Sequence, residues 1–321
     1  MPNNLTRPSL ILEEIVFIDG LTRAGKFLLA KIVSNMEAVE YFQSQILIEH
    51  LPIFNYLKLM DNSDAISYFK LNINNYIYER LIGRNINTRI ESSGINNATD
   101  YDLYLKRATE LDGAIAVQKG LSENRLPSFL VHEVLPHIEF IQTAVPKFKM
   151  INIQRHPLDI VFSWFQRGWG DRWGNDNLAF TPTLDINGIA TPWFAVGWPE
   201  EWAYLRPLER VIKSILHLYE LEDVAYNNFN NKQKILRISY EALFSNPMDI
   251  CKKISFFLGR HPYENMAQVL EREACPNKSL SFERQSRIAE LKKLAQPKYY
   301  EMAVEASNRY DSKWLLPPMQ Y

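Results

Sequence analysis

Short apolar runs alternate along this chain with amphipathic stretches. The runs that predict buried strands are 15–18, 128–132, 149–154 and 234–239. The stretches that predict helices are 26–37, the segment from Leu158 onward, 205–219 and 247–258. Strands that alternate with helices form parallel sheets covered on both faces. The pattern therefore predicts an α/β fold with a central parallel sheet flanked by helices.

The rest of the chain shows neither a repeat nor a linker. Residues 41–112 look mostly helical, with an expected loop at 91–97. Residues 167–203 are expected to form an irregular aromatic insertion, which contains Trp169, Trp173, Trp193, Trp198 and Trp202. We therefore predict a single domain over 1–321, with its core at about 15–290 and a C-terminal helical extension to 321.

Composition and charge narrow the class of protein. Of 321 residues, 46% are hydrophobic and 23% are charged, and the formal net charge of −1 argues against a nucleic acid as partner. The two cysteines, Cys251 and Cys275, predict buried reduced thiols rather than disulfides or a metal site. There is no basic start followed by an apolar run, and no stretch of about 18 apolar residues. We therefore expect a cytoplasmic protein without a membrane span.

A glycine-containing loop follows the first predicted strand. Residues 20–26 fit the phosphate-binding pattern G-x-x-x-x-G-K, but Phe27 stands where a P-loop enzyme has the serine or threonine that ligates magnesium. Amides at a helix N-terminus attract an anion, and Arg23 and Lys26 add positive charge. The loop predicts a phosphate site without a metal. The alternative is a plain strand-to-helix turn with two solvated basic residues.

A second motif, residues 155–163, follows the third predicted strand. Arg155 is expected at the carboxyl end of that strand, where open α/β sheets bind ligands. Pro157 suits the first turn of a helix, and Ser163 lies two helical turns further along. A guanidinium beside a hydroxyl is a good receptor for a phosphate. The alternative is a helix cap with a surface arginine.

These motifs resemble those of the sulfotransferases that use 3'-phosphoadenosine 5'-phosphosulfate (PAPS). Residues 21–29 are similar to that family's 5'-phosphosulfate loop, and residues 155–163 to its 3'-phosphate motif R-x-P-x-D-x-x-x-S. Residues 238–259 resemble the strand end and helix that follow, and residues 282–287 resemble a late loop that closes over the 3'-phosphate. The resemblance implies a P-loop sulfotransferase fold. It also implies in-line transfer of a sulfuryl group from PAPS to an acceptor hydroxyl, with 3'-phosphoadenosine 5'-phosphate (PAP) as product.

The resemblance also implies roles for single residues. Around the 5'-phosphosulfate it places Arg23, Ala24, Gly25, Lys26, Phe27 and Leu28. Around the 3'-phosphate it places Arg155, Ser163, Arg284, Gln285 and Ser286. Tyr240 is implied beside the adenine, with a core aromatic as the alternative. Lys26 and Phe27 depart from the family pattern because they replace two threonines.

Sulfuryl transfer needs a base and stabilisation of the departing phosphate. Arg23, Lys26 and the loop amides are expected to stabilise that charge. The resemblance places the base after the second strand, where Glu133 is the first candidate and His132 the alternative. His137 is expected on a helix surface.

Two other functions fit the same residues. One is a P-loop kinase that uses ATP and magnesium, and the other is a non-catalytic module that binds an adenosine bisphosphate. The acceptor is left open among a carbohydrate, a lipid and a small metabolite such as a phenol. The tryptophans of 169–202 are either the wall of the acceptor site or ordinary core. The sequence makes no prediction of the oligomeric state.

Overall fold

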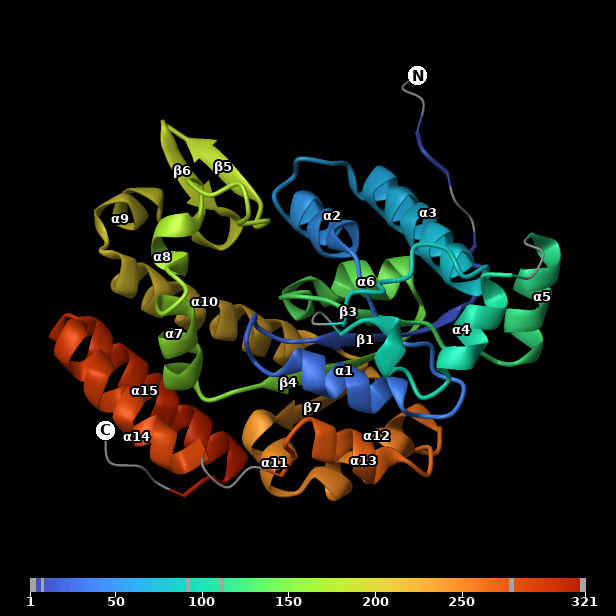
Figure 1. Cartoon of the computed structure of the whole chain (residues 1–321). Coiled ribbons are helices and arrows are strands. Elements are labelled where there is room, and N and C mark those ends of the chain that lie inside the picture. Colours follow the sequence, from blue (N-terminus) through green and yellow to red (C-terminus); the bar gives the residue numbers. More distant parts are fainter. Residues whose placement is uncertain (1–3, 7–8, 91–92, 110–112, 277–279, 318–321) are drawn as a thin grey trace.

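The structure is a computed structural model that describes residues 4–6, 9–90, 93–109, 113–276 and 280–317, with backbone alone at 280–282. Its centre is a five-stranded parallel sheet in the order β2-β3-β1-β4-β7 (Figure 1). The strands are β1 (Glu14–Asp19), β2 (Gln43–Ser44), β3 (Ser128–Leu130), β4 (Lys147–Gln154) and β7 (Ile235–Ser239). The strands expected from the apolar runs are confirmed, and β2 is a short edge strand that the pattern did not predict.

Helices surround this sheet. The α-helices are α1 (Lys26–Ser34), α2 (Ile46–Tyr56), α3 (Asn62–Leu81), α4 (Tyr101–Arg107), α5 (Ala114–Ser122), α6 (Ile138–Ala144), α7 (Pro157–Phe165), α8 (Trp169–Arg172), α9 (Pro199–Tyr204), α10 (Pro207–Asn228), α11 (Tyr240–Ser245), α12 (Pro247–Leu258), α13 (Met266–Arg272), α14 (Leu280–Leu294) and α15 (Pro297–Trp314). The 3-10 helices are η2 (Ile95–Asn97), η3 (Leu135–His137), η4 (Trp193–Ala195) and η5 (Lys232–Lys234). A separate hairpin joins β5 (Thr183–Ile186) to β6 (Ile189–Pro192).

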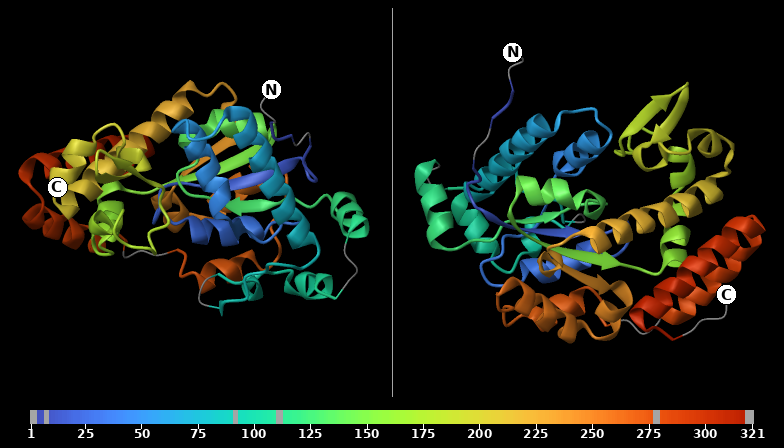
Figure 2. Two further views of the ribbon diagram at one scale, coloured as in Figure 1. Left: turned by 90° about the horizontal axis from the view of Figure 1, so that it is seen from above. Right: turned by 180° about the vertical axis from the view of Figure 1, so that it is seen from behind.

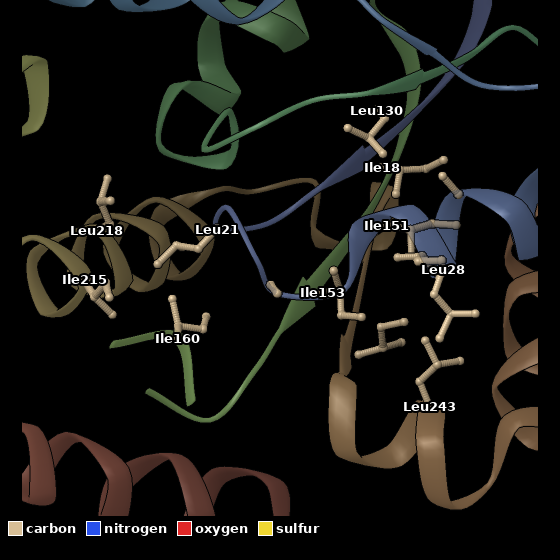
Figure 3. Close-up of a cluster of buried hydrophobic side chains, with 14 of the residues drawn as sticks. Ile18, Leu21, Leu28, Leu130, Ile151, Ile153, Ile160, Ile215, Leu218 and Leu243 are labelled. Carbon is tan, nitrogen blue, oxygen red and sulfur yellow. The ribbon is translucent and has the colours of Figure 1, made fainter. Parts of the chain in front are cut away.

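The two faces of the sheet enter different hydrophobic clusters. Ile18 and Ile151 pack with Leu28 of α1 on one face (Figure 3). Their neighbours along the strands, Phe17 and Met150, belong to the other cluster, which includes side chains of α3 and α6. Because successive side chains of a strand point to opposite faces, burial on both sides makes each strand an uninterrupted apolar run. This arrangement confirms the predicted parallel sheet flanked by helices.

The helices beyond the carboxyl ends of the strands form a second layer of packing. Helices α14 and α15 pack against α7, and α15 also packs against α10 (Figure 2). Leu21, just after β1, is buried among Ile160 of α7 and Ile215 and Leu218 of α10 (Figure 3). The start of the glycine-containing loop is therefore fixed by apolar contacts rather than left free in solvent.

Several expected elements differ in the structure. Segment 167–203, expected to be irregular, contains α8, the β5–β6 hairpin, η4 and α9. The hairpin turn has Asn187 and Gly188 at φ values of 53° and 81°, and an Asn-Gly pair is a strong hairpin signal that the sequence prediction did not use. Segment 282–287, expected to be a loop, lies within α14. Of the expected loop at 91–97, residues 91–92 lie outside the described residues, and 95–97 form η2.

The end of one helix and the state of the cysteines agree with expectation. Helix α12 starts at Pro247, and Gly259 caps its end in the left-handed region, as predicted. Both cysteines are buried and free. In the described ranges, no helix combines the length and the apolar character needed to cross a membrane.

Candidate active site

The loop between β1 and α1 approaches its neighbours so closely that glycine is required. Gly25 caps α1 with a φ of 104°, and a Cβ there would lie 2.5 Å from Cδ2 of Tyr240. Gly20 has a φ of 144°, and its Cβ would lie 2.2 Å from the carbonyl oxygen of Ile153 on β4. The first N–H groups of a helix have no acceptor within the helix. The start of α1 is thus held as a site for an anion.

The loop opens into the main cavity, which has a volume of about 810 Å³. Residues that follow β1, β3, β4 and β7 line it, as expected for a ligand site at the carboxyl ends of parallel strands. Helix α2 and the segment that carries α8 and the hairpin supply the remaining walls. In Figure 1 the hairpin and α8 lie to the left of α2. His50 of α2 contacts the carbonyl oxygen of Phe180 across the cavity at 2.9 Å.

Arg23 and Arg155 line the main cavity, and Ser163 lies directly behind Arg23 without lining the cavity itself. The Nε atom of Arg23 donates to Oγ of Ser163 at 3.2 Å, and Nη1 of Arg155 donates to the carbonyl oxygen of Arg23 at 3.2 Å. Arg167 also donates to Oγ of Ser163, at 3.1 Å. Burial lowers the pKa of Arg23, and repulsion from Arg167 and Arg155 lowers it further. The three guanidinium groups therefore gather positive charge that an anion would neutralise.

Arg155 itself is oriented by the residues around it. Its guanidinium carbon lies 4.3 Å from the centroid of the Tyr240 ring. Its Nε atom is buried without a hydrogen-bond partner among the described residues, although it lies 3.9 Å from Oδ2 of Asp159. A buried donor without an acceptor costs free energy until a ligand supplies one. A phosphate oxygen is an acceptor of the kind that this donor lacks.

Lys26 is buried, and its Nζ donates to the carbonyl oxygen of Gly20. Burial lowers the pKa of Lys26, while the charges of Glu133 and Asp19 act in the opposite direction. The side chain lines the main cavity although little of it is exposed. Phe27, the other departure from the family pattern, is half exposed and also lines the cavity. Ala24 is buried beneath the loop, and Leu28 is buried in the core while its edge reaches the cavity.

Both candidate bases line the main cavity, but they face different partners. Oε1 of Glu133 accepts from the backbone N–H of Thr22 in the loop at 2.6 Å. Glu133 has a φ of 53°, a left-handed conformation that costs free energy for a non-glycine residue. His132 instead points toward α2, where its Nδ1 lies 2.8 Å from Oε1 of Glu49. Glu133 is thus the candidate in direct contact with the phosphate loop.

His137 was expected on a helix surface, and this expectation is wrong. Its side chain is buried between Tyr56 and Trp193, with ring centroids at 5.3 Å and 5.4 Å. Burial lowers its pKa to about 4. The sequence pattern failed here because η3 packs against α10, which lies far away along the chain.

The late residues Arg284, Gln285 and Ser286 do not line the main cavity. Gln285 and Ser286 are exposed on α14. Arg284 is buried and forms ion pairs with Asp159 at 2.8 Å and with Glu241 at 2.6 Å. Its charge is therefore already balanced by two carboxylates. The segment that was expected to form a loop over a phosphate is part of helix α14. Through Arg284 this helix contacts both α7 and α11.

The aromatic segment divides into two parts. Trp169, Trp173 and Trp193 line the main cavity. Trp202 is buried and packs against Trp173 at 5.6 Å between ring centroids, and Trp198 packs behind Trp202 at 5.8 Å. Of the tryptophans that line the cavity, Trp169 is half-buried and presents surface to a ligand, whereas Trp173 and Trp193 are each only 3% exposed.

Sequence reasoning missed three residues of the site. Arg167 lies one helical turn beyond Ser163, and this spacing was a usable signal because residues four apart share a helix face. Glu49 belongs to no motif, so only the fold reveals its contact with His132. Trp164 donates from its Nε1 to the carbonyl oxygen of Thr22 at 2.8 Å and so fixes the phosphate loop to α7.

The chain belongs to the sulfotransferase family: residues 13–298 match the model of the sulfotransferase domain. It is accordingly a transferase. A sequence comparison with curated proteins finds no match.

Solved structures with a similar chain path include other sulfotransferases. The sulfotransferase domain of the curacin biosynthetic pathway is 14% identical, with 79% of this chain and 76% of that chain covered and a TM-score of 0.44. The sulfotransferase of Alicyclobacillus acidocaldarius is 16% identical, with 88% of this chain and 97% of that chain covered and a TM-score of 0.40. A mouse sulfotransferase complexed with PAP is 16% identical, with 84% of this chain and 65% of that chain covered and a TM-score of 0.36. Family membership rests on the domain match and not on these likenesses.

Proposed function

We propose that this chain transfers a sulfuryl group from PAPS to an acceptor hydroxyl. The observation that carries the proposal is the cluster of Arg23, Arg155 and Arg167 around Oγ of Ser163, next to the phosphate loop. Such a cluster suits a ligand with phosphates at two places. PAPS would supply an activated sulfuryl group, and PAP would be the product.

Different residues are proposed to bind the two phosphate groups of the donor. Arg155 and Ser163 would hold the 3'-phosphate, with the ring of Tyr240 beside the adenine. The loop amides, Arg23 and Lys26 would hold the 5'-phosphate and stabilise the negative charge that grows on it. Lys26 replaces a threonine hydroxyl with a buried amine, and although burial lowers its pKa, any positive charge on it would be weakly screened.

Glu133 is the proposed base, which takes the proton from the acceptor hydroxyl. Its Oε1 is held by the N–H of Thr22, and Oε2 has no hydrogen-bond partner among the described residues. A carboxylate fixed in this way presents one oxygen to the acceptor without turning away. His132, paired with Glu49, is the second candidate.

The acceptor hydroxyl is proposed to enter between α2 and the aromatic segment. Trp169, which is half-buried at the cavity, would offer a face on which the apolar side of a sugar or an aromatic ring can stack, with the buried Trp173 packed against it. Both a carbohydrate and a small metabolite fit this description. The kinase alternative lacks support, since Phe27 cannot ligate magnesium.

Thermal unfolding with PAP, compared with ATP and magnesium, tests the donor site. A ligand at about 100 times its Kd should stabilise the folded state by about 2.7 kcal/mol. We expect PAP to stabilise the wild type and Arg309→Ala, an exposed arginine on α15, but to stabilise Arg155→Ala much less. Stabilisation by ATP and magnesium alone would contradict the proposal.

A screen with sulfur-labelled PAPS and a panel of sugars, phenols and hydroxylated lipids then identifies the acceptor class. Labelled product should form in the wild type and fall in Glu133→Gln. PAP binding without label transfer to any acceptor in the panel would favour a module that binds the nucleotide and has lost its chemistry.

A further inference from the structure

A smaller side cavity of about 230 Å³ adjoins the main cavity. The two share Phe27 and Ser44 as lining residues. Ser44 ends β2, and α2 begins two residues later and runs along the wall that carries Glu49. The side cavity thus meets the main one on the side of the candidate bases. One water occupies about 30 Å³ in the liquid, so the side cavity has room for several atoms of a ligand.

Arg80 of α3 lines this side cavity and forms no ion pair with any of the described residues, although the charge of Glu40 acts on it from a distance. The residue is 5% exposed, and its Nη1 atom is buried without a hydrogen-bond partner among the described residues. The guanidinium carbon lies 5.4 Å from the centroid of the Tyr104 ring. Stacking on a ring leaves the in-plane N–H donors unused. A buried guanidinium normally has acceptors for these donors.

The carboxylates near Arg80 already accept hydrogen bonds from other arginines. Arg107 donates to both oxygens of Glu40 at 3.0 Å and 2.9 Å. Arg125 donates to Glu40 at 2.8 Å and to Asp100 at 2.9 Å. Three buried guanidiniums, counting Arg80, therefore face two carboxylates. The unmatched positive charge is the one at the side cavity.

Tyr41 supplies a second donor to the same cavity. Its hydroxyl is buried and has no hydrogen-bond partner among the described residues. Burial and then the charge of Glu273 raise the pKa of Tyr41, whereas the charges of Arg272 and Arg80 act in the opposite direction. A protonated hydroxyl beside a guanidinium matches the oxygens of a carboxylate or a sulfate.

Phe27 separates the two cavities. Its ring lies edge-on to Phe42, a second lining residue of the side cavity, at 6.0 Å between centroids. A threonine at this position would offer a hydroxyl to the donor phosphate and would leave a wider passage. The departure from the family pattern therefore builds an apolar partition between the phosphate loop and the side cavity.

We propose that the side cavity binds an anionic group, a carboxylate or a sulfate, carried by the acceptor, while the acceptor hydroxyl lies near Glu133 in the main cavity. This inference rests on the proposed sulfotransferase function. The acceptor class is then an acidic hydroxyl compound, such as a hydroxy acid or an acidic sugar. Arg80 and Tyr41 determine that specificity by binding and take no part in the chemistry.

The test uses the full chain saturated with PAP, so that the donor site is filled. Tryptophan fluorescence follows the binding of 4-hydroxybenzoate against its methyl ester, and of glucuronate against glucose. Inorganic sulfate and acetate form a separate arm for free anions. The variants are Arg80→Met, Tyr41→Phe and the exposed control Arg309→Met. PAP binding is measured for every variant by thermal unfolding.

We expect the wild type and Arg309→Met to bind at least one acid about tenfold more tightly than its neutral partner. The preference should vanish in Arg80→Met and fall several-fold in Tyr41→Phe, with PAP binding unchanged. If Arg80→Met does not fold, the preference of Tyr41→Phe for acids over their neutral partners tests the proposal in its place. Equal binding of acids and neutral partners overturns the proposal, as does a preference that survives both substitutions. Sulfate or acetate binding that depends on Arg80, without any preference among acceptors, would reassign the cavity to a free anion. A wild type that does not bind PAP would instead contradict the proposed sulfotransferase function.

Discussion

The guanidinium of Arg155 lies over the ring of Tyr240, with its carbon 4.3 Å from the ring centroid. Arg155 follows β4 and Tyr240 follows β7, so the contact joins the ends of two adjacent strands. The edge of the same ring excludes any side chain at Gly25. One tyrosine therefore fixes both the arginine and the entrance of the phosphate loop. This position gives Tyr240 a role in shaping the site, whereas the sequence left it between an adenine neighbour and a core residue.

Replacing Arg155 by lysine should weaken PAP binding although the charge is retained. Lysine cannot stack its ammonium as a plane on Tyr240 or offer paired donors to a phosphate. A lost hydrogen bond to a charged group costs about 1.5–3 kcal/mol, so we expect Kd to rise roughly 10- to 100-fold by isothermal calorimetry. The matched control is Arg309→Lys on the surface of α15. An unchanged Kd in Arg155→Lys would mean that Arg155 contributes only its charge.

Replacing Gly25 by alanine should destabilise the fold more than the same change at Gly188. Both glycines have a positive φ, 104° and 81°, but a Cβ at Gly188 meets nothing within 4 Å. The Gly188→Ala variant therefore measures backbone strain alone, which costs about 1–3 kcal/mol. At Gly25 the Cβ also collides with the Tyr240 ring, so the free energy of unfolding in urea should fall further. Equal losses in the two variants would show that the ring moves aside without cost.

The parts of this structure that the sequence predicted are those set by local patterns. The strand, loop and helix around Gly20 and Lys26, and Pro157 at the start of α7, depend on residues close together in the chain. A parallel sheet then brings the ends of its strands to one edge. For this reason the loop that carries Arg23 and the motif that carries Arg155 and Ser163 were expected at the same edge of one sheet, whereas the hydrogen bond from Arg23 to Ser163 was not.

The parts that the sequence did not predict depend on partners far apart in the chain. Arg284 was expected in a late loop that closes over the 3'-phosphate, but it lies within helix α14 and pairs with the carboxylates of Asp159 and Glu241. His137 is buried because α2 and η4 close around it. No regular spacing in the sequence relates residues that are this far apart. The helix at 282–287 was not predicted because the family pattern suggested a loop there.

Replacing Glu133 by glutamine should abolish most of the activity and spare nucleotide binding. The amide oxygen can still accept the N–H of Thr22, so the loop keeps its shape. Loss of a general base lowers kcat by roughly 10² to 10⁴. The measurement is label transfer to the acceptor found in the screen, beside PAP stabilisation as a control for the donor site.

His132→Ala supplies the contrast for that variant. It removes the pair with Glu49 without touching the phosphate loop, so we expect a smaller change in kcat than in Glu133→Gln. The reverse order, with activity lost in His132→Ala and kept in Glu133→Gln, would assign the base to His132. Activity retained in both variants would eliminate both candidates.

A buried carboxyl beneath the site should make stability depend on pH. Glu222 of α10 is fully buried and accepts from Asn152 at 3.4 Å and from Gln154 at 3.1 Å. Burial, with the charge of Asp19, raises its pKa from 4.5 to about 8. The amide oxygens of Asn152 and Gln154 are buried without a partner among the described residues, so after rotation of its amide either residue could accept the O–H of a protonated Glu222.

The sign of the effect follows from the raised pKa of Glu222. Between pH 4.5 and about 8 the folded state keeps the proton that the unfolded state has lost, so this group's contribution to stability falls as pH rises. The slope from one group is at most about 1.4 kcal/mol per pH unit. His137 acts oppositely at low pH, because its pKa is lowered to about 4. We therefore compare the urea unfolding of Glu222→Gln with wild type at each pH, which cancels the contribution of His137. The variant should gain relative stability as pH rises from 5 to 8, whereas the exposed control Glu305→Gln should not. A difference from wild type that stays constant with pH would show that Glu222 is ionised in the folded protein.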